Sequence, residues 1–276
     1  MTGSEHRVNG FVKALLFWAI FQGLFFTGGF SFLFPMLPKW GSGILLGSVI
    51  TGITFLVTLI FLKFDTLTLS DLGMVLKRSS LSRFGVALLF GCGLFAGFYS
   101  LYYLLTPVSL SPVESANILH LLLINTVLFI VLGTMEEVAF RGYLLEKMAV
   151  AVGIRWSIYI TSLLFGLYHG LAFESITGPA VWGLFYGVLA FWTRGLAVPI
   201  GFHVGVNLVQ GLMSEKTKWV EGIWRFELME TVTPLTIAQL TLLLQGLMLI
   251  SGILLVEYYL RVSIKRRDNS LLQNQV

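Results

Sequence analysis

Long apolar segments are the feature that most constrains how this chain can fold. A helix that crosses about 30 Å of hydrocarbon needs about 20 predominantly apolar residues. The sequence contains eight segments close to that length, at roughly 11–36, 43–64, 84–105, 118–145, 156–173, 176–193, 196–213 and 237–260. We therefore predict an all-α, polytopic membrane protein of about eight transmembrane helices.

The composition agrees with a membrane protein and excludes other classes. Charged residues make up only 12% of the chain, whereas soluble domains contain about 25%, and the mean hydropathy is +0.86. Cys92 is the single cysteine, so an intrachain disulfide is excluded. The formal net charge is +4, but no basic tract resembles a nucleic-acid site, so nucleic acid is not an expected partner.

The distribution of Lys and Arg predicts the orientation in the membrane. With the N-terminus inside, the outer segments contain four of the 18 basic residues, namely Lys39, Lys216, Lys218 and Arg225. The others fall in cytoplasmic segments, which predicts that both termini are cytoplasmic. The absence of targeting additions favours a bacterial plasma membrane.

Three charged side chains interrupt the apolar segment 118–145: Glu136, Glu137 and Arg141. A charge in the centre of a membrane helix costs about 2.5–3.5 kcal/mol on insertion scales, so each needs a partner or a use. Glu137 and Arg141 are four residues apart and share one helix face. Glu136 projects about 100° away, so one carboxylate can pair with Arg141 while its neighbour faces a cavity.

Two later segments add polar residues at a similar depth. His169 follows Phe165 by four residues, and His203 precedes Asn207 by four, so each pair shares a helix face. At ~1.5 Å per residue from the nearest cytoplasmic basic residue, Glu136, His169 and His203 lie about 16, 21 and 14 Å deep. This common depth predicts one shared site near the cytoplasmic face, with substrates entering from the cytoplasmic leaflet.

Each of these residues also has a simpler interpretation when it is taken alone. A buried Glu–Arg pair often ties helices together, an intramembrane His often packs with a hydrogen bond, and Asn207 alone would join helices. A proton-coupled transporter also places acids and histidines in the membrane, but it should show broken helices in matching halves, which this sequence does not. A catalytically idle scaffold, such as a bacteriocin immunity factor, is a further alternative.

Together the polar residues form three motifs on successive membrane segments. They are Glu136-Glu137-x-x-x-Arg141, Phe165-x-x-x-His169 and His203-x-x-x-Asn207. In this order they resemble the motifs of the CPBP family, the CAAX proteases and bacteriocin-processing (Abi) intramembrane proteases. The resemblance covers about residues 118–213, and it implies an endopeptidase that hydrolyses a peptide bond of a membrane-associated protein or peptide.

The chemistry of the residues fits the activity that the resemblance implies. Glu136 would act as the general base that takes a proton from the attacking water, and His169 would hold and polarise that water. His203 and Asn207 would donate hydrogen bonds to the developing oxyanion.

The other motif residues have supporting roles in this interpretation. Glu137 and Arg141 would orient the helix and balance charge, and Phe165 would contribute to packing or to contact with the substrate.

The same resemblance leaves the use of a metal open. Glu136, His169 and His203 form a His/His/carboxylate set, which is known as the protein ligand set of catalytic zinc, and members of the family are commonly classed as metalloproteases. The same residues can also activate water without a metal. A divalent cation such as Zn²⁺ is therefore one of two alternatives.

We expect three regions along the chain. Residues 1–117 form three N-terminal transmembrane helices with a cytoplasmic connecting segment, whose polar part at 65–83 is a candidate amphipathic surface helix. Residues 118–213 form the CPBP-like catalytic core. Residues 214–276 form an outer interfacial loop, the last transmembrane helix and a basic cytoplasmic tail.

Overall fold

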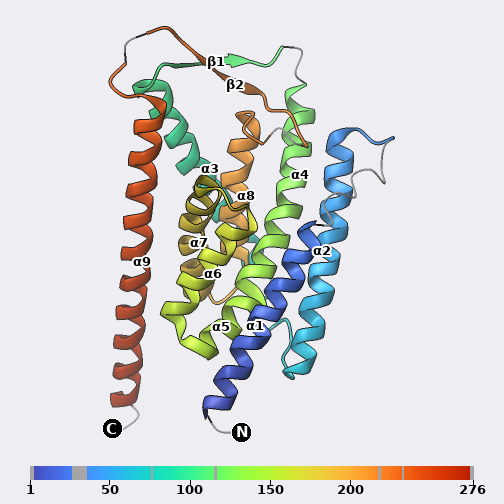
Figure 1. Ribbon diagram of the computed structural model, residues 1–276, viewed down its shortest axis with the longest axis vertical. Helices are drawn as coiled ribbons and strands as arrows, with labels where there is room; N and C mark the ends of the chain where they lie inside the picture. Colours follow the sequence, from blue (N-terminus) through green and yellow to red (C-terminus); the bar gives the residue numbers. More distant parts are fainter. Residues whose placement is uncertain are drawn as a thin grey trace.

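The chain folds into long, roughly parallel helices, as the apolar segments predicted (Figure 1). A computed structural model describes residues 3–26, 36–75, 77–114, 117–216, 219–231 and 233–273. Within these residues, five helices are long and apolar enough to cross a membrane: Lys39–Phe64, Arg78–Leu105, Ile118–Val152, Ile176–Thr193 and Ile237–Ile264. The protein is thus an integral membrane protein, while the number of eight crossings and the orientation of the termini stay predictions.

Each predicted segment overlaps a helix in the described part of the chain. The elements in order are α1 (Gly3–Phe26), α2 (Lys39–Phe64), α3 (Arg78–Leu105), β1 (Val108–Pro112), α4 (Ile118–Glu137), the π-helix η2 (Val138–Leu144), α5 (Leu145–Val152), α6 (Ile154–Tyr168), α7 (Phe173–Thr193), α8 (Ala197–Leu212), β2 (Trp224–Leu228) and α9 (Ile237–Gln273). The last helix continues well past the predicted end at 260.

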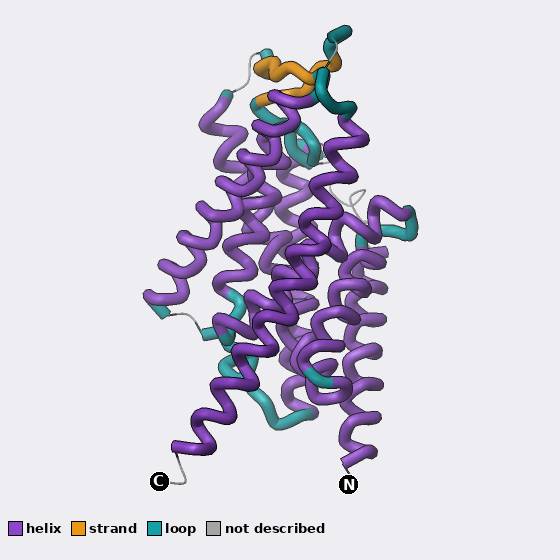
Figure 2. Tube along the Cα trace, turned by 90° about the vertical axis from the view of Figure 1, so that its left-hand side faces the viewer, coloured by secondary structure: helices purple, strands orange, loops and turns teal. Residues whose placement is uncertain are grey.

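The two ends of the molecule differ in what they contain. The start of α1 and the end of α9 lie at one end, which we call the termini end (Figures 1 and 2). The strands β1 and β2 lie at the opposite end, which we call the sheet end. They pair antiparallel, with Leu110 opposite Phe226. The sequence did not predict this ribbon, because its two strands are far apart in the chain.

Glycines allow α3 and α8 to pack in direct backbone contact. A Cβ atom on Gly205 would lie 2.2 Å from the Leu88 carbonyl oxygen, and one on Gly201 would lie 2.3 Å from that of Phe84. Only glycine fits at such an approach, which is the role of small residues between membrane helices. Gly93 and Gly97 of α3 are also four residues apart, like Gly201 and Gly205, but a Cβ on either would meet nothing within 4 Å. A four-residue glycine spacing alone therefore does not identify a helix interface.

At the termini end, the carboxylate of Asp65 joins three helices just after α2 ends. It accepts hydrogen bonds from Lys13 of α1 and from the Tyr143 hydroxyl of η2, the latter at 2.7 Å. Lys147 of α5 lies 2.7 Å from Oδ2 of Asp65, the same oxygen that accepts the hydrogen bond from Tyr143. Burial opposes the ionisation of Asp65, but these partners outweigh it and lower its pKa to about 2.

The connection that follows Asp65 differs from the expected surface helix. Among its described residues, the chain makes turns up to Met74, and α3 begins only at Arg78. The side chain of Asp71 accepts hydrogen bonds from the backbone N–H and the hydroxyl of Thr68, and Gly73 has a φ of +68°. Such local side-chain bonds compete with helix formation, so they favour the turn.

Candidate active site

The helix that carries the paired carboxylates changes its geometry directly after them. α4 ends at Glu137, and the π-helix η2 follows before α5 restores the α-helical pattern. Gly142 has a ψ of −114°, far from helical values, and all seven residues of η2 are buried. π-Helical turns of this kind are frequent at functional sites. Here the wider turn carries Arg141, one turn after Glu137.

Glu137 is completely buried, with a hydrogen-bond partner on one oxygen and an ion-pair partner on the other. One of its oxygens, Oε1, lies 2.8 Å from Nδ1 of His203, and the other lies 3.4 Å from Nε of Arg141. The predicted pairing of Glu137 with Arg141 is therefore present, and it extends to α8. Because a buried charge needs such partners, Glu137 fixes how α4, η2 and α8 meet.

Aromatic rings surround the guanidinium of Arg141. Its Cζ lies 4.3 Å from the ring centre of Phe165 and 5.0 Å from that of Tyr186, and Nη2 lies 3.4 Å from the Gly183 carbonyl oxygen. A desolvated cation over an aromatic face gains about 2 kcal/mol or more. Phe165 thus contacts the cation of the Glu137–Arg141 ion pair. This contact gives a physical reason for an aromatic residue at the first position of the Phe165-x-x-x-His169 motif.

Glu136 faces the two predicted histidines. Its Oε2 atom lies 3.6 Å from Nε2 of His203 and 3.9 Å from Nε2 of His169. This oxygen is buried, and it has no hydrogen-bond partner among the described residues. The separations exceed the hydrogen-bond range and are of the kind that a water molecule bridges. The three residues that were expected at one depth therefore converge on one point.

The second nitrogen of each imidazole is held by an acceptor. Nδ1 of His169 lies 2.8 Å from the Phe165 carbonyl oxygen, and Nδ1 of His203 contacts the carboxylate of Glu137. A carbonyl only accepts, so Nδ1 of His169 carries a proton and its Nε2 presents a lone pair when the ring is neutral. α6 ends at Tyr168, where the last carbonyls lack helical partners, and this explains the bond to His169.

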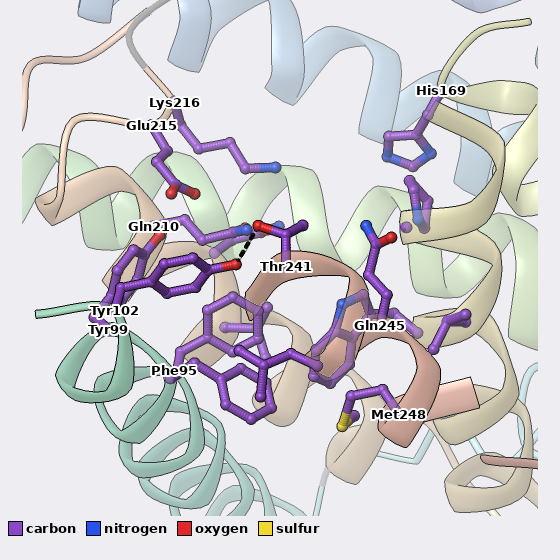
Figure 3. A pocket seen from close by; sticks show the side chains of 18 of the residues that line it. Phe95, Tyr99, Tyr102, His169, Gln210, Glu215, Lys216, Thr241, Gln245 and Met248 are labelled. Atoms are coloured by element: carbon purple, nitrogen blue, oxygen red, sulfur yellow. Dashed lines mark hydrogen bonds between the residues drawn. The ribbon is translucent and has the colours of Figure 1, made fainter. Parts of the chain in front are cut away.

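A cavity of about 490 Å³ adjoins these side chains (Figure 3). His169, His203 and Asn207 line it together with Phe165, so both histidine motifs face the same space. Tyr186 also lines it and stacks on the ring of His203 at 4.6 Å between centroids. Sequence reasoning missed Tyr186, because a tyrosine in an apolar helix carries no signal of its own.

The types of ligand atom at this site suit zinc, but the way in which the described side chains are arranged does not show a metal site. Two Nε2 atoms and an unpartnered carboxylate oxygen face one another, and acceptors on the far nitrogens are typical around zinc-binding histidines. Yet no group of three or more His, Cys, Asp or Glu side chains in the described ranges is arranged to hold a metal ion. The catalytic and metal roles of the individual residues stay predictions.

Comparison with known proteins places the matching region on these same helices. Residues 118–209 match the family model of the type II CAAX prenyl endopeptidases, Rce1-like. The match covers the stretch from α4 into α8 and confirms the family resemblance that the three motifs indicated. The matched region is therefore similar to that of the CAAX-type intramembrane proteases, which are peptidases. No curated protein and no solved structure matched the chain.

Proposed function

We propose that this protein is an intramembrane endopeptidase that cleaves a membrane-associated protein or peptide with a water activated by Glu136. The observation that carries the proposal is the position of Glu136, whose unpartnered Oε2 faces Nε2 of both His169 and His203. A carboxylate with a free oxygen beside two imidazoles is suited to proton transfer from a water to a reacting group.

The first step is the attack of that water. The water lies between Oε2 of Glu136 and Nε2 of His169, which both accept its hydrogens. Glu136 takes one proton as the oxygen forms a bond to the peptide carbonyl carbon. The carbonyl π-bond breaks, and the oxygen becomes an oxyanion.

The second step is the collapse of this tetrahedral intermediate. The amide of Asn207, and Nε2 of His203 in its imidazolium form, donate hydrogen bonds to the oxyanion; loss of one such donor typically costs about 2.7–4 kcal/mol in the transition state. The carboxylate of Glu137 on Nδ1 stabilises the imidazolium. When the carbon–nitrogen bond breaks, Glu136 returns its proton to the leaving amine.

A metal-assisted version uses the same residues. Glu136, His169 and His203 would hold a divalent cation such as Zn²⁺, which supplies Lewis-acid polarisation of the water when bound. Chelation with phenanthroline separates the versions: the metal version expects loss of activity and recovery with Zn²⁺. Full activity in protein shown to be free of metal rules it out.

The experiment that tests the function compares the membrane-associated peptidomes of cells that carry the wild-type protein or Glu136→Gln at equal expression. We expect peptides or shortened membrane proteins that appear only with the wild type. With purified protein and a substrate found in this way, the rate should fall by about 10²–10⁴, the usual contribution of a general base.

A matched control makes the same Glu→Gln substitution at a position outside the proposed site. Glu257 pairs with Arg155 in a partly exposed ion pair of 2.8 Å, so Glu257→Gln should leave proteolysis unchanged. Identical peptidomes with a folded Glu136→Gln protein would contradict the proposal. They would favour the idle scaffold or, after a flux assay, the transporter. That the membrane is a bacterial plasma membrane stays a prediction.

A further inference from the structure

The cavity that adjoins the predicted site lies towards the sheet end. His169, His203 and Asn207 line it, whereas Glu136 lies behind these histidines and does not line it. From α3 it is lined by Phe95, Phe98, Tyr99 and Tyr102, which all belong to the half of that helix next to β1. From α9 it is lined only by residues from Ile237 to Met248, the first third of that helix. Val108 of β1 and Phe226 of β2 line it as well, so the ribbon forms part of its wall.

The short hairpin of α6 and α7 explains where this space comes from. α6 has 15 residues, or about 22 Å at 1.5 Å per residue, and the chain turns back immediately after His169. In Figure 1 the tops of α6 and α7 stop well below the ribbon, whereas α3, α8 and α9 continue towards it. The cavity occupies the region that the hairpin leaves free.

The opposite side of the site is closed by packed side chains. Phe140, Tyr143, Leu145 and Met148 follow the paired carboxylates towards the termini end, and each is 0% exposed. Tyr143 is in turn bonded to Asp65. At the sheet end, by contrast, the cavity wall includes the exposed residues Glu215 and Lys216. Exposed side chains in a cavity wall mark its mouth, so the site opens towards the sheet end.

Polar groups project into the space between this mouth and the catalytic residues. We call this part the polar chamber and define it by Tyr99, Tyr102, Gln210, Thr241 and Gln245. Figure 3 shows the amides of the two glutamines directed into the cavity, beside the 2.7 Å hydrogen bond that joins the hydroxyls from α3 and α9. The hydroxyl of Tyr99 is buried and lies near Glu215 at the mouth, although no hydrogen bond of standard geometry reaches it from the described residues.

These polar groups indicate which kind of molecule the polar chamber can bind. A hydrocarbon chain would leave the amides of Gln210 and Gln245 without partners, at a cost for each polar group that it covers. An extended polypeptide offers one N–H and one C=O per residue, which such amides and hydroxyls can pair. The chamber therefore matches a stretch of polypeptide backbone.

From these observations we propose that the substrate reaches Glu136 from the sheet end, past Glu215 and Lys216, with an extended polypeptide segment held in the polar chamber. This inference rests on the proposed endopeptidase function and adds its entry route. If both termini are cytoplasmic, as the distribution of Lys and Arg predicts, the sheet end is the outer end, and this route differs from the cytoplasmic-leaflet entry that residue depth predicted.

A blocking experiment tests the route. Lys216→Cys and Ser70→Cys each place a thiol at an exposed position, the first at the mouth and the second in the turn at the termini end. After labelling with a polyethylene glycol maleimide, we expect the Lys216→Cys protein to lose at least about tenfold in kcat/KM towards a polypeptide substrate, while the Ser70→Cys protein keeps its activity. Inhibition of only the Ser70→Cys protein would overturn the proposal.

A second pair of variants tests the chamber itself. Gln245→Cys places a thiol inside it, and Leu242→Cys places one on the outer side of the same helix, where Leu242 is 72% exposed. N-ethylmaleimide should inhibit the first and not the second, and bound polypeptide substrate should slow labelling of the first. Wild-type protein, with Cys92 alone, serves as the parent. Complete labelling of the Gln245→Cys protein without loss of activity would overturn the proposal.

These results are separable from the test of the function. If Glu136→Gln retains full proteolytic activity, the proposed function fails whatever the labelling shows. If Glu136→Gln is inactive and the labelled chamber and mouth variants remain active, the endopeptidase stands and only the entry route is wrong. Protection of the Gln245→Cys thiol by lipid vesicles without peptide, and not by peptide, would show a lipid in the chamber and reject the polypeptide.

Discussion

The two halves of the helical bundle on either side of Glu136 and Glu137 differ in packing: the half towards the termini end is filled with side chains, and the half towards the sheet end contains a cavity. Towards the termini end, Glu137, Arg141 and Tyr143 lie in a fully packed layer that Asp65 ties to α1, α2 and α5. Towards the sheet end, the space between α3, α7, α8 and α9 holds a cavity of about 490 Å³. The comparison leads to a hypothesis in which the packed half fixes the geometry of the proposed site and the hollow half determines which molecules reach it.

If this division is right, the largest loss of stability follows from breaking the buried ion pair. Glu137→Gln leaves the guanidinium of Arg141 buried without its counter-charge, and removal of one partner of such a pair typically costs about 3–5 kcal/mol. The free energy of unfolding in detergent micelles measures this. The double variant Glu137→Gln/Arg141→Met should be less destabilised than Glu137→Gln alone. A Glu137→Gln protein as stable as the wild type would contradict the view that the buried ion pair stabilises the packed half.

A smaller and pH-dependent loss is expected at Asp65. Its pKa falls from 3.8 to about 2 on folding, so Asp65→Asn should cost about 2 kcal/mol at neutral pH. Because the folded pKa is the lower one, the stabilisation is complete above about pH 4 and is lost as the pH falls towards about 2. Unfolding free energies of wild type and variant should therefore converge over that range.

A control for this measurement is available in the next turn of the chain. Asp71→Asn removes a carboxylate whose partner is the nearby exposed Thr68, and because Asp71 is itself exposed, its effect on the free energy of unfolding should be much smaller than that of Asp65→Asn. A difference in unfolding free energy between the wild type and Asp65→Asn that stays constant from pH 7 to pH 2 would show that the charge of Asp65 does not join the helices.

The smallest effect on stability is expected in the hollow half. Gln245→Leu should change the unfolding free energy by no more than about 0.5 kcal/mol, but it removes a hydrogen-bonding group worth about 0.5–1.5 kcal/mol. We therefore expect KM for a polypeptide substrate to rise about two- to tenfold with little change in kcat. Leu242→Ala on the outer side is the control. A large loss of stability with unchanged KM would assign Gln245 to the packed half instead.

The sequence predicted the parts of this structure that follow from local rules. Apolar length located the helices, and the four-residue spacing placed Glu137 beside Arg141 and His203 on the same cavity as Asn207. The bond between Glu137 and His203 was not predictable, because it depends on how α8 packs against α4.

Features that depend on tertiary structure escaped the sequence analysis. The pairing of β1 with β2 joins segments more than a hundred residues apart, and the π-helix at Gly142 is imposed where its seven residues are buried on all sides. The side on which the cavity opens depends on where α6 stops relative to its neighbours. Counting residues from the nearest basic side chain gives depth but no direction.

The short length of α6 also has a consequence for the surrounding lipid. At about 22 Å, it falls roughly 8 Å short of the ~30 Å hydrocarbon thickness, and it is not one of the five helices long and apolar enough to cross a membrane. Leu163 on its outer surface is nevertheless 51% exposed. A bilayer adapts to such a short apolar surface by thinning beside it, at a cost of fractions of a kcal/mol per Å. Thinning there would bring headgroups and bulk water closer to His169 at the end of this helix. In the hydrolytic function that we propose, the length of this one helix would then help to supply water to the site.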